Sequence, residues 1–173
     1  MDLLNGLKNI TTFIFDIDGV LTDGKILVLE SGEWARVMHT KDGYAMQLAV
    51  KKGYRIFIVS GAAKSAVDAR LRKLGIDEVH FGIKNKKSFV HDLIQSYGLK
   101  KEEVLYMGDD IPDLPVASEV GVFACPSDAV DEILQIAHFN TCKPGGAACV
   151  RELIEKVMKL NQSWSEDETI PST

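Results

Sequence analysis

Short apolar runs alternate with longer amphipathic segments along most of the chain. The runs are rich in β-branched and aromatic residues, which is typical of buried strands, and they lie at 13–15, 55–59, 104–107 and 121–124, with a shorter one at 78–81. Helices are predicted between and after them, over 43–52, 63–74, 87–97, 114–119, 129–137 and 148–160. Asp42 is a candidate N-cap for the first of these helices, and Gly53 ends it.

Strands that alternate with helices in this way favour a parallel sheet with helices on both faces, because right-handed crossovers allow few other arrangements. The predicted fold class is therefore α/β, a doubly wound parallel sheet. Residues 25–39 depart from the pattern, since two short extended stretches flank a Ser-Gly turn and predict a β-hairpin. We expect one domain over 1–160 and a flexible polar tail over 161–173.

Polar side chains follow three of the predicted strands. Asp16 and Asp18 follow the first strand, Ser60 the second, and Asp109 with Asp110 the run at 104–107. Ligands bind beyond the carboxyl ends of parallel strands, so we expect these side chains to share one cleft. Two nearby carboxylates repel unless a cation or a proton lies between them, which favours a hard metal such as Mg²⁺. The simpler interpretation is a polar turn at a strand end.

Composition narrows the classes of function. The 173 residues are 46% hydrophobic and 26% charged with a formal net charge of −5, which fits a soluble domain and argues against a nucleic-acid surface. No run approaches the length of a membrane span and no signal-peptide pattern is present, so a cytoplasmic protein with a small substrate is predicted. Three cysteines without paired spacing predict buried, reduced thiols and no zinc site.

Four motifs resemble those of the haloacid dehalogenase superfamily. They are Asp16-Ile17-Asp18-Gly19-Val20, Ser60-Gly61, a lysine before a helix at Lys86, and Gly108-Asp109-Asp110 with Asp113. The segments 18–24, 41–44, 108–110 and 145–146 further resemble the 3-deoxy-D-manno-octulosonate 8-phosphate (KDO 8-phosphate) phosphatases. The resemblance covers about residues 10–160. It implies a Rossmann-like haloacid dehalogenase fold and Mg²⁺-dependent release of phosphate from a phosphorylated sugar acid used in lipopolysaccharide synthesis.

The resemblance also implies roles for the aspartates. Asp16 would attack phosphorus and form an aspartyl phosphate, while Asp18 would protonate the leaving group and later activate water. Mg²⁺ would be held by Asp16, Asp109 and the backbone carbonyl of Asp18. Asp110 and Asp113 would orient the lysine or a metal-bound water, although both could instead cap the following helix.

Phosphate would be bound by three further residues. Ser60, the amide of Gly61 and the ammonium of Lys86 would contact the phosphoryl oxygens. Ser60 could instead be a helix cap. Lys84 and Lys87 compete with Lys86 for this role, and a basic cluster of this kind is often only solvated.

The chain departs from the family at two positions that bear on the sugar. Ala62 and Ala147 stand where many relatives carry an arginine. Arg70 and Lys64 are then the candidates for binding the sugar carboxylate, although Arg70 could be an ordinary exposed helix arginine. A nine-carbon ulosonic acid 9-phosphate, of KDN or sialic acid, is an alternative substrate. A non-catalytic assembly domain is an alternative of another class, which the intact aspartates disfavour.

No segment is long enough to form the cap domain that covers the cleft in most of the superfamily. The family resolves this as a homotetramer whose hairpins form a central barrel and whose neighbouring subunits complete each site. Apolar positions of the hairpin fit such an interface, although a hairpin lying on its own domain would look similar; they are Ile26, Val28, Trp34 and Val37. Trp164 is the residue that would anchor the tail over a neighbour's cleft.

Overall fold

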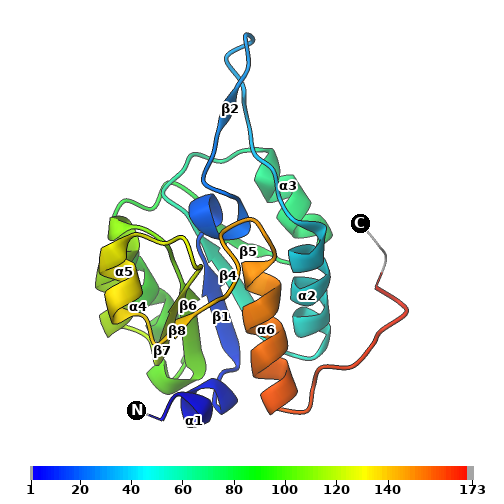
Figure 1. Ribbon diagram of the computed structural model, residues 1–173, viewed down its shortest axis with the longest axis vertical. Helices are drawn as coiled ribbons and strands as arrows, with labels where there is room; N and C mark the ends of the chain where they lie inside the picture. The colour runs from blue at the N-terminus through cyan, green and yellow to red at the C-terminus, as the bar shows by residue number, and fades with distance from the viewer. Residues whose placement is uncertain (1, 171–173) are drawn as a thin grey trace.

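Six parallel strands form the central sheet (Figure 1), in the order β5-β4-β1-β6-β7-β8. The computed structural model describes residues 2–170. The strands are β1 (Thr12–Phe15), β4 (Arg55–Val59), β5 (Glu78–His80), β6 (Val104–Met107), β7 (Val122–Cys125) and β8 (Phe139–Asn140). Every pairing in this sheet is parallel, and β1 lies between β4 and β6. The predicted α/β class is confirmed, and the strand order reverses at β1, where such sheets bind ligands.

Helices cover both faces of the sheet. One face is packed against α1 (Leu3–Lys8), α2 (Thr40–Lys51), α3 (Ala66–Lys73) and α6 (Cys149–Leu160). The other is packed against α4 (Lys86–Ser96), α5 (Asp131–Ile136) and the 3-10 segment η3 (Ile111–Ser118), and a short turn η2 (Lys101–Glu103) precedes β6. Alternate residues of each strand face opposite layers. The strands β1, β4, β6 and β7 are therefore buried on both sides, which explains their continuous apolar runs, whereas the edge strands β5 and β8 are only partly buried.

Several element boundaries differ from those predicted. Asp42 does not cap α2, because His39 Nδ1 accepts the Lys41 N–H at 3.1 Å and the helix begins at Thr40. Asp42 lies in the first turn instead, where it accepts the backbone N–H of Arg151 at 2.6 Å. The helix expected from residue 63 begins at Ala66. Neither α1 nor β8 was predicted, since six and two residues carry too little periodicity.

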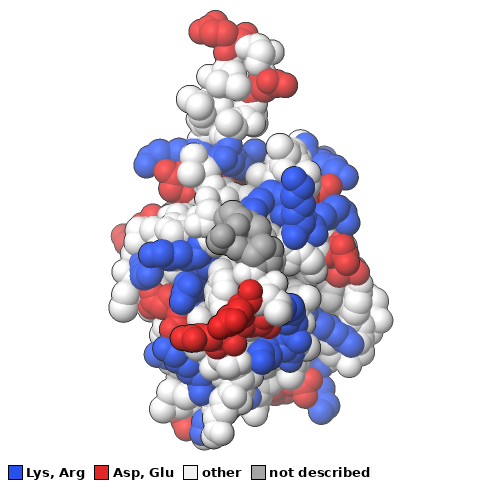
Figure 2. All heavy atoms as spheres, turned by 90° about the vertical axis from the view of Figure 1, so that its right-hand side faces the viewer, with Lys and Arg blue, Asp and Glu red and all other residues white. Residues whose placement is uncertain are grey.

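The hairpin stands away from the body at the edge where β1 ends (Figure 1), and its strands are β2 (Leu27–Val28) and β3 (Trp34–Ala35). Trp34 is 61% exposed and Val37 78% exposed, so the hairpin does not lie on its own domain. The shaft of the hairpin, formed by β2 and β3, is largely uncharged, and acidic side chains lie near its tip (Figure 2). Within residues 2–170, no further domain is inserted between β1 and β4 or between β4 and β5, so the expected lack of a cap is confirmed.

The described part of the tail packs against its own chain. The Trp164 ring meets Tyr44 edge-on at 6.3 Å between centroids and lies 5.3 Å from the Arg151 guanidinium. Ile170 is 8% exposed. Trp164 therefore contacts α2 and α6 of its own chain, which differs from the expected place over a neighbour's cleft, whereas the flexibility of the tail stays a prediction. Residues 171–173 lie outside the described part.

Two further expectations concern the cysteines and the membrane. Cys125 and Cys149 are buried free thiols as expected, whereas Cys142 is exposed, so the expectation was wrong for that residue. None of the helices in residues 2–170 is both long and apolar enough to cross a membrane. Basic and acidic side chains are interspersed over the face of the body that Figure 2 displays.

Candidate active site

The end of β1 brings Asp16 to the carboxyl edge of the sheet. The chain then turns through the irregular segment η1 (Ile17–Leu21), and Asp16 Oδ1 accepts the Ile17 N–H at 2.7 Å. Gly19 has a φ of +80°, and a Cβ built there would overlap the carboxylate of Asp109. Glycine at this position therefore allows the loop after β6 to approach the loop after β1.

A chain of buried charges joins three elements at this edge. Lys86 Nζ lies 2.7 Å from Asp16 Oδ2 and 2.7 Å from Asp113 Oδ1, and the side chains of all three residues are no more than 10% exposed. The Tyr106 hydroxyl also donates to Asp113 Oδ1, at 2.5 Å, and the Asp109 N–H donates to Asp113 Oδ2 at 3.1 Å. Asp113 therefore fixes the position of Lys86, which in turn holds Asp16.

The excess of carboxylates shifts their ionisation. Burial, together with repulsion from Asp113, raises the pKa of Asp16 to about 6 against the attraction of Lys86. Burial and repulsion from Asp113 and Asp16 raise the pKa of Asp109 to about 7. Burial opposes the charge of Lys86, but Asp16 and Asp113 outweigh it and raise the pKa of the lysine. The site holds more negative charge than its lysine neutralises.

This charge and its donor atoms fit a divalent metal. Oxygens of Asp16, Asp109 and Asp113 lie within 4.8 Å of one another. Carboxylate oxygens are the ligands that Mg²⁺ prefers. Asp113 accepts hydrogen bonds from Lys86, Tyr106 and the N–H groups of Asp109 and Asp110, more than the two that Asp16 accepts, so Asp16 and Asp109 are better placed to bind the ion.

The carboxylate of Asp18 points elsewhere, toward the hairpin. Arg36 Nε lies 2.6 Å from Asp18 Oδ1, and Arg36 Nη2 lies 3.0 Å from Asp18 Oδ2. Sequence reasoning missed Arg36, because one arginine after a short strand carries no signal of its partner 18 residues earlier.

The predicted strand ends meet in one open cleft of about 530 Å³. It is lined by Asp16, Asp18, Gly19, Gly24, Ser60, Gly61, Ala62, Ile83, Lys84, Lys86, Asp109, Asp110, Pro112 and Asp113. Ser60 is 2% exposed, and its hydroxyl accepts the Ala62 N–H at 3.1 Å, so it also stabilises the turn after β4.

The structure distinguishes the three competing lysines. Lys86 contacts Asp16, as described above, whereas Lys84 lines the cleft and Lys87 lies 3.5 Å from Glu119 on the far side of the helix start. Asp110 caps η3, where its Oδ1 accepts the Ile111 N–H at 2.7 Å. Asp113 shares that capping box and also lies 2.7 Å from Lys86, whereas its orienting role stays a prediction.

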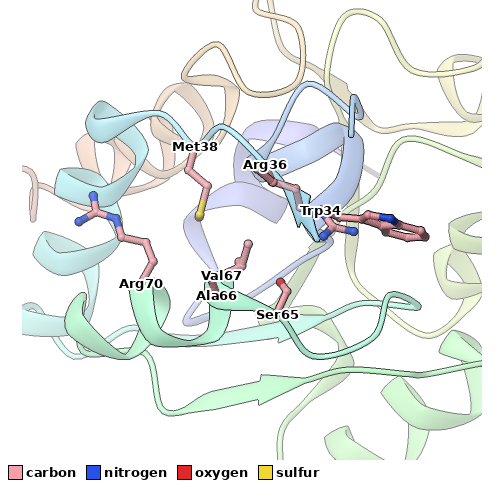
Figure 3. A pocket seen from close by; sticks show the side chains of 8 residues that line it. Trp34, Arg36, Met38, Ser65, Ala66, Val67 and Arg70 are labelled. Atoms are coloured by element: carbon pink, nitrogen blue, oxygen red, sulfur yellow. The ribbon is translucent and has the colours of Figure 1, made fainter. Parts of the chain in front are cut away.

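Arg70 and Lys64 do not line this cleft. Lys64 pairs with Asp68 at 2.9 Å, and its side chain is 68% exposed. Arg70 lines a second cavity of about 300 Å³ at the base of the hairpin, together with Arg36. In Figure 3 the Arg70 guanidinium extends away from Arg36. Neither candidate for the sugar carboxylate therefore reaches the catalytic cleft of its own chain.

Gly145 and Gly146 support the loop after β1 from outside the cleft. The Gly146 N–H donates to the Val20 carbonyl at 3.0 Å, and the Gly145 N–H donates to Asp128 Oδ1 at 2.8 Å. A Cβ on Gly145 would overlap the backbone carbonyl of Gly19. Close backbone contact is thus the physical reason for a glycine pair here.

A parallel sheet with paired aspartates after β1 and a lysine bridging two carboxylates defines a haloacid dehalogenase-like hydrolase, and a family model of that description matches residues 41–121. Individual phosphatases are also similar to this chain in sequence. The 3-deoxy-D-manno-octulosonate 8-phosphate phosphatase of Yersinia pestis is 31% identical over 91% of this chain and 84% of that protein. The phosphatase of the same description from Escherichia coli K12 is 32% identical with the same coverage.

Solved structures of such phosphatases are also similar to this chain. The structure of the Yersinia pestis phosphatase has a TM-score of 0.90 with 30% sequence identity, and the match covers 94% of this chain and 88% of that chain. The Moraxella catarrhalis phosphatase was solved with magnesium, phosphate and KDO. Its TM-score is 0.90 with 28% sequence identity, and the match covers 93% of this chain and 92% of that chain. The chain belongs to the KDO 8-phosphate phosphatase family of haloacid dehalogenase-like hydrolases, and the resemblance first found in its motifs is confirmed.

Proposed function

We propose that this protein is a Mg²⁺-dependent phosphatase that hydrolyses KDO 8-phosphate to KDO and phosphate. The observation that carries the proposal is the cleft, in which Asp16 lies 2.7 Å from Lys86 and beside Asp109. The relatives named above support the substrate. The magnesium, phosphate and KDO in the Moraxella catarrhalis structure support the cofactor and the products.

Asp16 and Asp18 divide the chemistry of the first step. A carboxylate oxygen of Asp16 attacks phosphorus, and the bond between phosphorus and the sugar oxygen breaks. Asp18 gives its proton to the departing sugar oxygen, which would otherwise leave as a costly alkoxide. The product is an aspartyl phosphate on Asp16 and free KDO.

Asp18 reverses its role in the second step. Its carboxylate takes a proton from water, and the water oxygen attacks phosphorus, so that the bond to Asp16 breaks and phosphate is released. Asp18 lines the open cleft, which gives water access to both groups.

Charge in the cleft is balanced by the remaining residues. When bound, Mg²⁺ supplies positive charge that offsets the repulsion between the carboxylate and the phosphate, and Asp16, Asp109 and the backbone carbonyl of Asp18 would hold it. Lys86 places a second positive charge beside Asp16. The hydroxyl of Ser60 and the amide of Gly61 line the same cleft and can donate to phosphoryl oxygens. Asp113 orients Lys86.

Recognition of the sugar acid is assigned to a neighbouring subunit. Arg70 and Lys64 do not line the cleft of their own chain, so they would bind the sugar carboxylate across an interface. The exposed apolar hairpin supports a homotetramer with a central barrel of hairpins. A cytoplasmic location stays a prediction from the sequence.

The test is phosphate release from KDO 8-phosphate and from the 9-phosphates of KDN and sialic acid, with and without Mg²⁺. We expect Mg²⁺-dependent release with the eight-carbon substrate preferred, and its loss in Asp16→Asn. Asp92→Asn, an exposed aspartate on α4, is the matched control. Preference for a nine-carbon substrate would change the substrate and keep the mechanism, whereas no release from any of them would favour the assembly domain.

A further inference from the structure

We propose that Arg36 is a positioning residue for Asp18, the acid and base of the two steps above, so that the hairpin sets the geometry of proton transfer in the cleft. This inference rests on the proposed phosphatase chemistry, and it adds a residue that lies outside the four motifs.

The contact between Arg36 and Asp18 is close and two-pronged. Nε and Nη2 of the guanidinium meet the two carboxylate oxygens at 2.6 Å and 3.0 Å. A planar guanidinium fork matches a carboxylate in this way and restricts its rotation, which a single ammonium cannot do. The Arg36 side chain is 6% exposed although it leaves an exposed hairpin, so its place is defined by packing.

Asp18 needs such a constraint because its backbone does not provide one. It lies inside an irregular turn with a φ of −74° and a ψ of +126°, directly before Gly19 at a φ of +80°. Its side chain is 32% exposed at the open cleft, and besides Arg36 it accepts a long hydrogen bond from the Thr22 hydroxyl, at 3.5 Å. Proton transfer requires the donor oxygen to lie within hydrogen-bond reach of the leaving oxygen, so orientation of this carboxylate enters the rate directly.

Arg36 and Asp18 line two different cavities. Asp18 lines the catalytic cleft, whereas Arg36 lines the neighbouring cavity with Trp34, Met38 and Ser65 (Figure 3). A substrate in the cleft would meet the carboxylate and not the guanidinium. This arrangement favours a positioning role over direct binding of the sugar.

The position of the Arg36 side chain depends on the hairpin. The residue directly follows β3, in which Trp34 pairs with Val28 and Ala35 with Leu27. Leu27, Val28 and Trp34 are each more than 60% exposed. Contacts made on this apolar shaft therefore determine where the guanidinium, and with it Asp18, is held.

The test compares leaving groups. A sugar or other primary alkyl phosphate needs a proton donor in the first step, whereas p-nitrophenyl phosphate does not, because p-nitrophenolate is a stable anion. For Arg36→Met we expect kcat on the alkyl phosphates to fall about 100-fold, with KM within about threefold, by the usual size of acid catalysis. The pre-steady-state burst of p-nitrophenolate should slow less than about fivefold.

Four variants complete the comparison. Arg36→Lys keeps the charge without the fork and should recover part of the lost rate, which also provides the test if Arg36→Met does not fold. Asp18→Asn should show the same leaving-group pattern, and adding Arg36→Met to it should cost little more. Arg72→Met breaks a similar ion pair, with Asp68 at 3.0 Å on α3, and should act as wild type.

Three outcomes would overturn the inference. An equal loss on both leaving groups would indicate a general structural role, and a rise in KM for the sugar phosphate at constant kcat would assign Arg36 to binding. If wild type hydrolyses other alkyl phosphates but not KDO 8-phosphate, the proposed substrate is wrong and the comparison of leaving groups still tests Arg36. Wild type inactive on every monoester would overturn both proposals.

Discussion

At the scale of single residues, the site depends on how one lysine is shared between two carboxylates. Lys86 is 6% exposed and would carry a costly buried charge without Asp16 and Asp113. The pairing leaves its charge 2.7 Å from Asp16, the proposed nucleophile. The same contact would therefore serve both folding and the proposed catalysis.

Replacement of Lys86 should affect both the stability of the fold and the rate of catalysis. We expect Lys86→Met to lower kcat about 10³-fold by loss of charge at the phosphoryl group, and to destabilise the fold by about 3 kcal/mol by leaving buried carboxylates unpaired. Lys87→Met, which removes only an exposed pair with Glu119, should stay within about twofold of wild type. Steady-state kinetics and urea unfolding measure the two effects. Equal activity of the two variants would contradict the assignment of Lys86.

Asp42 makes stability depend on pH. Burial raises its pKa from 3.8 to about 6, and its Oδ2 has no hydrogen-bond partner. The folded state therefore keeps this proton where the unfolded state has lost it, so the free energy of unfolding falls as pH rises from about 4 through about 6.

An amide at position 42 should remove this dependence. Asn can still accept the Arg151 N–H but cannot ionise. The stability of Asp42→Asn relative to wild type should therefore increase by about 1 kcal/mol between pH 5 and pH 7.5, from the constant of 1.36 kcal/mol per pKa unit. Urea unfolding of both proteins at the two pH values measures it. A difference that is constant or decreases with pH would show that Asp42 ionises as freely in the folded chain as in the unfolded one.

At the scale of elements, the strands were predictable and the loops that shape the cleft were not. The buried runs at β4 and β6 have no competing pattern, because both faces of each strand are covered. The start of α2 was missed because a histidine caps it, a residue that the usual preference for Ser, Thr, Asp and Asn does not include. The turn η1 depends on a contact between Gly19 and Asp109, which are distant in the sequence.

Two glycines separate the effect of backbone strain from that of steric overlap. Gly19 and Gly82 have φ values of +80° and +69°, but a Cβ at Gly82 would meet nothing within 4 Å. Gly82→Ala should therefore cost only about 1 kcal/mol of strain. Gly19→Ala should cost about 1–3 kcal/mol more, because it displaces Asp109, and should lower activity at least about 100-fold.

Thermal unfolding and Mg²⁺ titration of activity would measure these effects. The predicted signature of Gly19→Ala is a raised requirement for Mg²⁺ beyond any loss of stability. Equal behaviour of the two alanine variants would mean that the approach of Asp109 to the loop is not needed.

At the scale of the whole molecule, the site residues divide by how far their partners lie along the chain. Asp16, Asp109 and Ser60 were predictable, because every strand of a parallel sheet ends at the same edge. The pairing of Arg36 with Asp18 depends on the fold of the hairpin and left no pattern in the sequence. The resemblance to a family supplied the substrate, which the aspartates alone do not define.

The apolar hairpin should hold the assembly together. Val28→Glu with Val37→Glu places charges on side chains that are 65% and 78% exposed, and we expect the mass in solution to fall from four chains to fewer. Leu4→Glu with Ile136→Glu alters side chains that are 53% and 41% exposed elsewhere and should leave the mass unchanged. Multi-angle light scattering measures both. A wild-type protein that is already monomeric would contradict the proposed tetramer.

The most direct test of the account is to find the phosphoryl group on the enzyme. Single-turnover reactions with KDO 8-phosphate would be quenched in acid and digested, and tandem mass spectrometry would locate the phosphate in the peptide of residues 9–25. We predict the label on Asp16, more of it in Asp18→Asn if loss of the base slows hydrolysis of the intermediate, and none in Asp16→Asn. Label on a different residue, or turnover without any labelled enzyme, would contradict nucleophilic catalysis by Asp16.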